Sequence, residues 1–260
     1  MRGDRGRRPL LGPLLVAAML LLAACQPRQA RRAVRGEPAI EATVVTIQTT
    51  IQPQNRTFTH ALVIGEDKAR SGDEVDRWRL FDFKNGNVTF VDEITKTYRT
   101  ESVPSLLAAA RTAASQPLPA GLPSVTVTRT GVLRMMQGAE AMQIVMRAGT
   151  YAREVWVARH PSIPPQLFSM MLASAPPSSK LSAMTRSAND ALLASDGFPL
   201  ADHSEIAYDD KKLTVDHNVV RIERKNVPQS WLTISAEYRD VTPKPAPPQP
   251  PAAKRPRAKK

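Results

Sequence analysis

Hydrophobic and polar residues alternate with a period of two along most of the chain between Ala39 and Thr242, which is typical of strands that bury one face. A first strand would collect Val45, Ile47, Thr49 and Ile51 on one face, and a second would collect Phe58, His60, Leu62 and Ile64. Asn85-Gly86 is a strong two-residue hairpin signal. The pattern predicts an antiparallel meander of six strands. After the second strand, Gly65–Lys68 is predicted to form a turn into a short third strand, and the last three strands are Asp76–Phe83, Asn87–Asp92 and Thr95–Glu101.

Three stretches have helical character. Ser105–Ala114 follows Pro104 and is rich in Leu and Ala, and Pro164-Pro165 opens a second stretch in which Leu167, Met170 and Met171 share a face. Ser179–Leu193 is the third. Further strands are predicted between and after these helices, at Val125–Met135, Ala141–Arg147, Tyr151–Arg159, Leu200–Tyr208, Leu213–Arg224 and Trp231–Asp240, with a polar turn at Asp209–Lys212. About eleven strands and three helices, without a strand–helix–strand rhythm, predict an α+β fold with a large antiparallel sheet.

The first 24 residues have the composition of an export signal. A basic stretch from Arg2 to Arg8 precedes an apolar run, Leu10–Ala24, that is shorter than the roughly 20 apolar residues of a membrane span. Leu22-Ala23-Ala24-Cys25 resembles the lipobox of bacterial lipoproteins. The resemblance implies cleavage between Ala24 and Cys25 and a diacylglycerol on the Cys25 thiol. The alternative is a signal peptide, or an uncleaved anchor, with an accidental cysteine.

Charge is concentrated at the two ends of the chain. The net charge is +12, of which residues 1–24 carry +3, residues 26–35 carry +4 and residues 244–260 carry +6, so that 12 − 3 − 4 − 6 leaves −1 for Gly36–Pro243. A nucleic-acid-binding protein concentrates basic residues on its folded face, so we expect no nucleic-acid partner. Residues 25–38 are predicted to form a flexible tether, residues 39–242 the folded domain, and residues 243–260 a disordered Pro-rich tail. This basic tail is expected either to contact an anionic envelope surface or to serve only solubility.

Several segments resemble an uncharacterised family of bacterial lipoproteins and periplasmic proteins, a domain of unknown function. They are Gly65–Arg70, Arg79–Asp92, Lys96–Tyr98, Val155–Ala158, Gly197–Leu200 and Val227–Tyr238. Against the family's terminal pattern, Trp231 stands for a Phe, Ser235 for a Pro and Glu237 for a Gly. That family is in turn similar in strand order to the LolA/LolB lipoprotein carriers. The resemblance implies a large curved antiparallel sheet, a LolA-like half-open barrel, with about three helices packed on it or closing it.

No motif in the chain indicates catalysis. The four histidines, at positions 60, 160, 203 and 217, lack metal-ligand spacing, and no nucleophile elbow, phosphate-binding loop or dinucleotide fingerprint occurs. Pairs of acidic residues such as Asp209-Asp210 fall in predicted turns. We therefore expect a protein that is not an enzyme and that uses neither a metal nor a cofactor.

Seven methionines lie in the middle strands and later helices, and methionine suits adaptable apolar surfaces. One interpretation is a ligand pocket lined by Met146, Trp156, Phe168, Met170 and Met171; the other is an ordinary hydrophobic core. The sequence thus predicts a non-catalytic envelope lipoprotein that binds a hydrophobic or amphiphilic ligand, such as a lipid or a lipoprotein acyl chain. We place it on the periplasmic face of the outer membrane of a Gram-negative bacterium. The alternative is an interaction or scaffold lipoprotein without a ligand cavity, and a hydrolase is the third candidate.

Overall fold

The computed structural model describes residues 37–72, 76–114, 125–175, 192, 194–208 and 211–243. The predicted export signal, Cys25 and the basic tail lie outside these residues. So do the third predicted helix, apart from Leu192, and the first half of the predicted turn at Asp209–Lys212.

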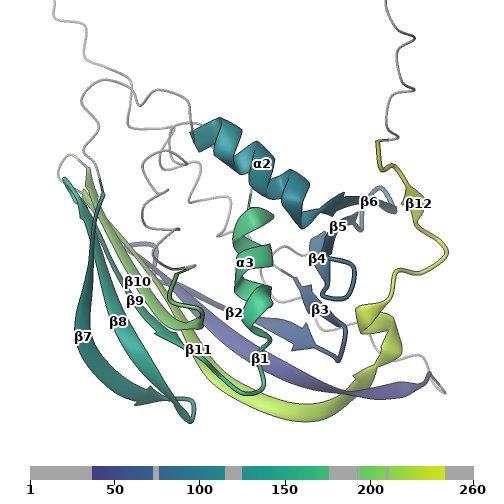
Figure 1. Ribbon diagram of the computed structural model, residues 1–260, viewed down its shortest axis with the longest axis horizontal. Helices are drawn as coiled ribbons and strands as arrows, with labels where there is room; N and C mark the ends of the chain where they lie inside the picture. The colour runs from purple at the N-terminus through teal and green to yellow at the C-terminus, as the bar shows by residue number, and fades with distance from the viewer. Residues whose placement is uncertain are drawn as a thin grey trace, which may run out of the picture.

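One twelve-stranded sheet dominates the described chain (Figure 1), in the order β12-β6-β5-β4-β3-β2-β1-β11-β10-β9-β8-β7. All neighbours are antiparallel except β12, which runs parallel to β6. The strands are β1 (Ala39–Gln52), β2 (Arg56–Ile64), β3 (Lys68–Ser71), β4 (Arg77–Asp82), β5 (Asn87–Asp92), β6 (Thr97–Ser102), β7 (Thr126–Met136), β8 (Ala139–Ala148), β9 (Tyr151–Ala158), β10 (Phe198–Tyr208), β11 (Lys211–Pro228) and β12 (Arg239–Asp240).

Local turn chemistry sets the first half of the sheet. The predicted hairpin around Asn85-Gly86 is confirmed, but its loop has four residues, Phe83–Gly86, and not the predicted two. Gly86 has a φ of +62°, and the Asp82 side chain accepts a hydrogen bond from the Asn85 N–H at 2.9 Å. β4 and β5 consequently pair from Asp82–Asn87 to Arg77–Asp92. Strands β2 to β6 form a meander, because each strand pairs with the next along the chain.

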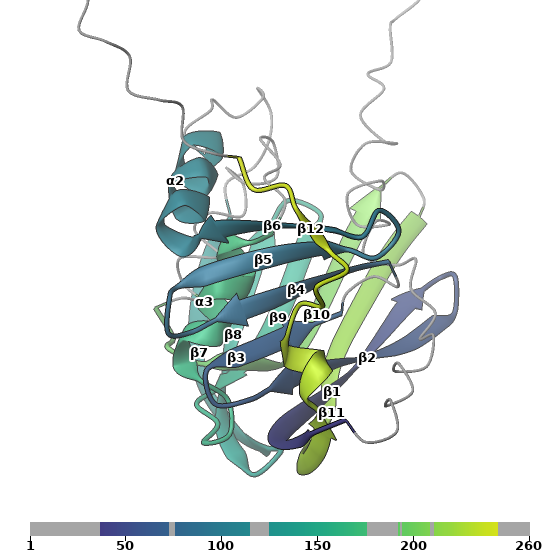
Figure 2. The ribbon, with the colours of Figure 1, turned by 90° about the vertical axis from the view of Figure 1, so that its right-hand side faces the viewer.

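Non-local pairing joins the two halves of the sheet. β1 pairs with β2 on one side and, along its whole length, with β11 on the other, from Ala39–Pro228 to Gln52–Thr214. Register shifts interrupt the ladders of β1 with β11, β9 with β10, and β7 with β8. Such bulges bend strands and increase twist, which accounts for the strong curvature visible in Figures 1 and 2.

Two α-helices, α2 (Val103–Ala114) and α3 (Pro165–Ala173), lie over the concave face of the sheet (Figure 1). α3 begins at Pro165, in agreement with the predicted Pro164-Pro165 start, and buries Leu167, Phe168, Met170 and Ala173. These side chains join a core formed by the strands on both sides of β1, which includes the fully buried Val45, Phe81, Ile144 and Val155. This core holds the helices against the sheet.

A second, smaller core lies on the other face. The segment after β11 forms a 3-10 turn, η1 (Gln229–Leu232), and crosses β3 to β6 (Figure 2) before β12. Leu232 and Tyr238 from this segment pack with Trp78, Leu80 and other buried residues of β1, β2, β4, β5 and β11. The C-terminal part of the domain therefore covers the convex face.

The predicted α+β class, a LolA-like half-open barrel with about three helices, is wrong. The described chain is predominantly β, and its helical content is two short α-helices of 12 and nine residues, one 3-10 turn and the single helical residue Leu192. The physical reason is that the strands are longer than the predicted apolar runs. β11 spans 18 residues because its pairing with β1 continues through polar positions up to Pro228.

The predicted strand Trp231–Asp240 is also wrong. Pro228 has no N–H to continue the ladder, and the chain turns into η1, with Tyr238 N–H bonded to the Ser235 carbonyl at 3.1 Å. Only Arg239 and Asp240 pair as a strand. Within the described residues, no helix combines the length and apolar character needed to cross a membrane.

Candidate functional site

A cavity of about 970 Å³ opens at one end of the concave face. Its wall comes from the start of β1, the β2–β3 turn, the connection between β9 and α3, the residues before β10, and one residue of β11. The residues are Ile40, Glu41, Ala42, Thr43, Ile64, Gly65, Glu66, Ala158, Arg159, His160, Pro161, Ser162, Ile163, Pro164, Pro165, Asp196, Gly197, Phe198 and Arg224.

The wall residues fall into two classes. Ile64, Ile163 and Phe198 are 4–5% exposed and belong to the main core. The charged wall residues Glu41, Glu66, Arg159, Asp196 and Arg224 are all exposed. The cavity thus combines an apolar, buried part with a charged rim.

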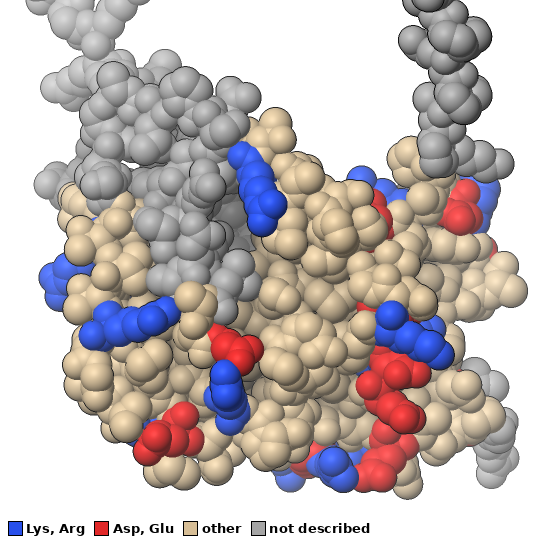
Figure 3. Space-filling view, viewed as in Figure 1, with Lys and Arg blue, Asp and Glu red and all other residues tan. Residues whose placement is uncertain are grey.

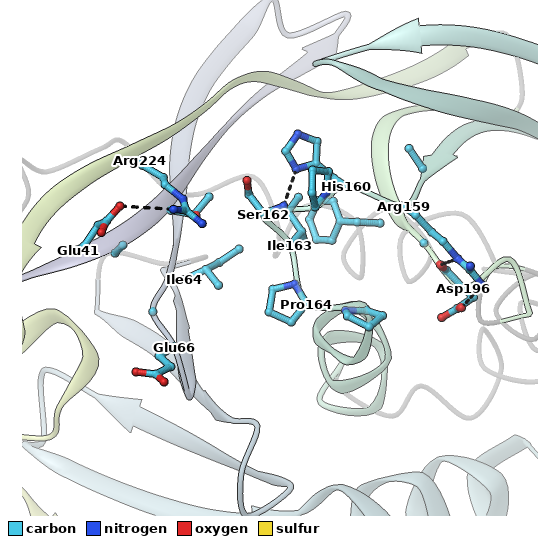
Figure 4. A pocket seen from close by; sticks show the side chains of 18 of the residues that line it. Glu41, Ile64, Glu66, Arg159, His160, Ser162, Ile163, Pro164, Asp196 and Arg224 are labelled. Atoms are coloured by element: carbon cyan, nitrogen blue, oxygen red, sulfur yellow. Dashed lines mark hydrogen bonds and ion pairs between the residues drawn. The ribbon is translucent and has the colours of Figure 1, made fainter.

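Two ion pairs lie on opposite sides of this rim (Figure 4). Arg159 donates to the Asp196 carboxylate and also to the Asp196 backbone carbonyl, the latter at 3.2 Å. Arg224 Nη1 lies 3.6 Å from Glu41 Oε1. Both pairs are exposed to solvent, so they contribute little to stability and their side chains are available to a polar ligand group.

Hydrogen bonds to the backbone orient His160. Its Nδ1 accepts from the Ser162 N–H at 3.2 Å, so its Nε2 carries the proton and donates to the Gln137 carbonyl at 3.1 Å. Because both ring nitrogens are engaged, the histidine holds the β9–α3 connection against the β7–β8 turn. This geometry gives it no free nitrogen to act as a general base.

Two glycines allow close packing at the cavity wall. A Cβ on Gly197 would lie 2.8 Å from the Ala158 carbonyl oxygen, and one on Gly65 would lie 2.6 Å from Leu232 Cδ1. Gly65 also closes the β2–β3 turn, with its N–H bonded to the Lys68 carbonyl at 2.8 Å. Gly65 and Gly197 therefore allow the β2–β3 turn and the start of β10 to form part of the cavity wall.

The pocket predicted from sequence lies elsewhere. Met146, Phe168 and Met170 are buried in the main core, and Trp156 and Met171 pack on it partly buried. Phe168 lines a second cavity of about 300 Å³, which Gly197 and Asp196 also line. The structure brings the five residues into one apolar cluster in which they pack as core, and their role in ligand binding stays a prediction.

The larger cavity itself was not predicted from the sequence. The one local signal is the run Arg159-His160-Pro161-Ser162 between a strand and a helix, whose proline and polar residues are typical of a loop. The other charged wall residues come from distant parts of the chain. The pairing of β1 with β11 and β2 brings Glu41, Arg224 and Glu66 together, and the pairing of β9 with β10 brings Asp196 beside Arg159.

A separate polar network lies within the concave face. Arg153 donates to both oxygens of Asp202, and His217 bonds to Thr49 at 2.8 Å. Burial alone would raise the pKa of Asp202, but the Arg153 guanidinium lowers it below its ordinary value. Burial lowers the pKa of His217. The network is satisfied internally and lines neither cavity, so we assign it a structural role.

Among the described residues, no group of three or more His, Cys, Asp or Glu is arranged to hold a metal ion. No family model matches the chain. A search of curated proteins also found no match. Two solved structures of PNGF-II, in space groups C2 and P21, are similar over 78% of this chain, each at 10% identity, with TM-scores of 0.43 and 0.39. The aligned part is 31% and 32% of those chains, so this chain spans about a third of their length.

Proposed function

We propose that this protein is a bacterial envelope lipoprotein, held to the membrane by lipid on Cys25, whose cavity binds an amphiphilic ligand without catalysis. The observation that carries the proposal is the cavity of about 970 Å³ with a buried apolar part and a charged rim. Ligand-binding cavities typically have volumes of roughly 300–1,000 Å³ and combine apolar walls with a few placed polar groups.

The arrangement of the wall favours an amphiphile over a purely apolar molecule. An acyl chain would contact Ile64, Ile163 and Phe198, while a polar head would remain among the charges of Arg159, Asp196, Arg224 and Glu41. Each rim pair joins one cation and one anion, so both signs are available to a zwitterionic or anionic head. An apolar molecule would leave these groups unused.

Non-catalytic binding is supported by the chemistry of the cavity. His160 is the one histidine of its wall, and both of its ring nitrogens bond to backbone atoms. Ser162 consequently lacks a neighbouring base in the orientation that nucleophilic catalysis requires. A serine hydrolase that relies on Ser162 and His160 is disfavoured for the same reason.

The ligand can be tested by native mass spectrometry of the full mature chain, extracted from membranes in mild detergent. Ser162→Trp would place a bulky side chain in the cavity, and we expect it to abolish most of the co-purified lipid. Ile94→Trp is the matched control, because Ile94 is exposed and lies outside both the cavity wall and β7. Absence of bound lipid in the wild type, or equal lipid in both variants, would favour the scaffold alternative.

The anchor is tested separately. Cells given a palmitate analogue should label the wild-type chain and should not label Cys25→Ser, because the thiol is the predicted acylation site. The variant should also leave the membrane fraction for the soluble envelope fraction, since a lipid anchor depends on burial of its acyl chains. Unchanged labelling of the variant would refute the anchor and leave the cavity proposal untouched.

A further inference from the structure

The edge strand β7 exposes apolar side chains to solvent. Val132, Leu133 and Met135 are 49%, 56% and 66% exposed, and they make up half of the large hydrophobic residues exposed in the described chain. Nearly every residue of β7 is exposed, and the strand has β8 on one side and no strand of the described chain on the other. Exposed apolar residues grouped on one edge mark an interaction surface.

The pairing of β7 with β8 orients this surface. Leu133 pairs with Met142, and Met135 lies two residues further along the same strand, so the two side chains project from the same face of the sheet. Met142 is partly buried against the main core. Leu133 and Met135 thus continue the apolar side of the sheet outward beyond the core.

The backbone of β7 is poorly suited to receive another strand. Its ladder with β8 is interrupted between Arg129 and Leu133, where Gly131 has a φ of +75°. The Val132 N–H donates to the Thr130 hydroxyl at 3.2 Å, and that hydroxyl donates to Gln143 Oε1 at 2.8 Å. A bulge and arginines on an edge strand are devices that prevent strand addition. A partner that needs no regular backbone ladder fits this edge better.

Basic side chains accompany the apolar ones. β7 and β8 carry Arg129, Arg134 and Arg147 against the single acid Glu140, a net charge of 3 − 1 = +2, and all four residues are exposed. Figure 3 shows basic side chains on the left-hand edge of the molecule, where β7 and β8 lie in Figure 1. Arginines beside exposed apolar residues suit an anionic lipid surface, because the guanidinium reaches the phosphates while the apolar groups enter the interface.

We propose that the β7 edge is a membrane-contact surface that prefers anionic phospholipids. Leu133 and Met135 enter the headgroup region, and the arginines of β7 and β8 contact lipid phosphates. The surface is next to the cavity, since the Gln137 carbonyl in the β7–β8 turn accepts the His160 hydrogen bond at 3.1 Å. The inference goes beyond the proposed function, as it requires neither an acylated Cys25 nor a bound ligand.

Vesicle co-sedimentation of the full mature chain carrying Cys25→Ser tests the surface without the lipid anchor. Leu133→Asp/Met135→Asp should weaken binding to phosphatidylglycerol-containing vesicles by about tenfold. Ile94→Asp/Val241→Asp is the matched control: it adds the same charge at residues that are 74% and 45% exposed outside β7, and it should bind like the parent. The basic ends of the chain are identical in all three proteins, so the difference reports β7 alone. Equal binding by both variants overturns the proposal.

A fluorescence measurement makes the test independent of affinity. Met135→Trp should shift its emission to the blue with phosphatidylglycerol vesicles and much less with pure phosphatidylcholine, whereas Ile94→Trp should not shift with either. Circular dichroism and thermal melting should match the parent for every variant, because the altered residues are exposed. An unshifted emission of Met135→Trp would refute the membrane role. A protein cross-linked in cells to a photoreactive residue at position 133, with vesicle binding unaffected by Leu133→Asp/Met135→Asp, would also refute it and would assign the edge to that protein partner.

Discussion

At the scale of single residues, two histidines on neighbouring strands, His217 and His203, have pKa values that are shifted in opposite directions. His217 lies within the concave face beside Thr49, and burial lowers its pKa below 6.5. His203 lies on the neighbouring strand, where the Asp216 carboxylate bonds to it at 2.6 Å and raises its pKa. Residue type and strand position alone do not distinguish the two histidines, because the sign of the pKa shift depends on the groups that each side chain faces.

These directions predict a pH dependence of stability. Below pH 6.5, His217 binds a proton more readily in the unfolded chain than in the folded chain, because burial lowers its folded pKa. The free energy of unfolding of the wild type should therefore fall toward pH 5 relative to that of His217→Gln. His203 should behave oppositely: its stabilising charge is present below pH 6.5 and is lost as the pH rises through its raised folded pKa. The stability of His203→Gln should therefore drop relative to wild type at low pH. Urea unfolding at pH 5, 6, 7 and 8 measures both, and parallel profiles for the two variants would contradict the assignment.

Gly197 should tolerate no side chain at the cavity wall. Its Cβ would lie 2.8 Å from the Ala158 carbonyl oxygen, which belongs to the backbone and cannot rotate away. We expect Gly197→Ala to lower the free energy of unfolding by about 1–3 kcal/mol. Gly72→Ala is the control, because its Cβ would meet nothing within 4 Å. Urea denaturation measures the free energy of unfolding of both variants. A similar loss of stability in both would show that the close approach of Gly197 to the Ala158 carbonyl is unimportant.

At the scale of secondary-structure elements, α3 links the sheet to the cavity. It starts directly after the cavity-lining Pro164, and Phe168 on α3 packs edge-on against Phe198 on β10, with ring centroids 6.1 Å apart. The predicted helical face of Leu167, Met170 and Met171 is confirmed for Leu167 and Met170, which are buried, while Met171 is partly buried. A loss of α3 packing would therefore reach the cavity wall.

Leu167→Ala should test how α3 is held. The side chain is fully buried, so its truncation should cost about 2–5 kcal/mol and reduce lipid co-purification because the cavity wall loosens. Arg111→Ala, at an exposed position of α2 that lines neither cavity, should change neither property. Thermal unfolding with native mass spectrometry provides both readouts, and wild-type stability of Leu167→Ala would show that α3 is not anchored through this residue.

At the scale of the whole molecule, the two faces of one sheet are covered by different parts of the chain. Helices cover the concave face, and the segment after Pro228 covers the convex face through Leu232 and Tyr238. Tyr238 also donates to Glu93 at 2.6 Å, and Trp78 donates to the same carboxylate at 2.7 Å. The end of the domain is thus part of the folded structure.

Two truncated chains distinguish the contribution of this segment to stability from that of the basic tail. A chain ending at Pro228 would expose Val63, Trp78 and Leu80, and we expect it to lose more than about 3 kcal/mol of stability. A chain ending at Pro243 keeps Leu232 and Tyr238 and should melt at the wild-type temperature. Thermal unfolding followed by circular dichroism measures both, and equal melting temperatures would contradict the role of the convex core.

The sequence by itself determined the local features of this protein. Period-two alternation located the strands from β1 to β11, Asn85-Gly86 located a hairpin, and Pro164-Pro165 located the start of α3, because each signal depends on neighbouring residues. The tertiary structure decided the fold class, the pairing of β1 with β11 across about 170 residues, and the path of the chain after Pro228. It also decided that the methionines pack as core while the cavity forms elsewhere, since a cavity wall is made by strands whose proximity depends on long-range pairing.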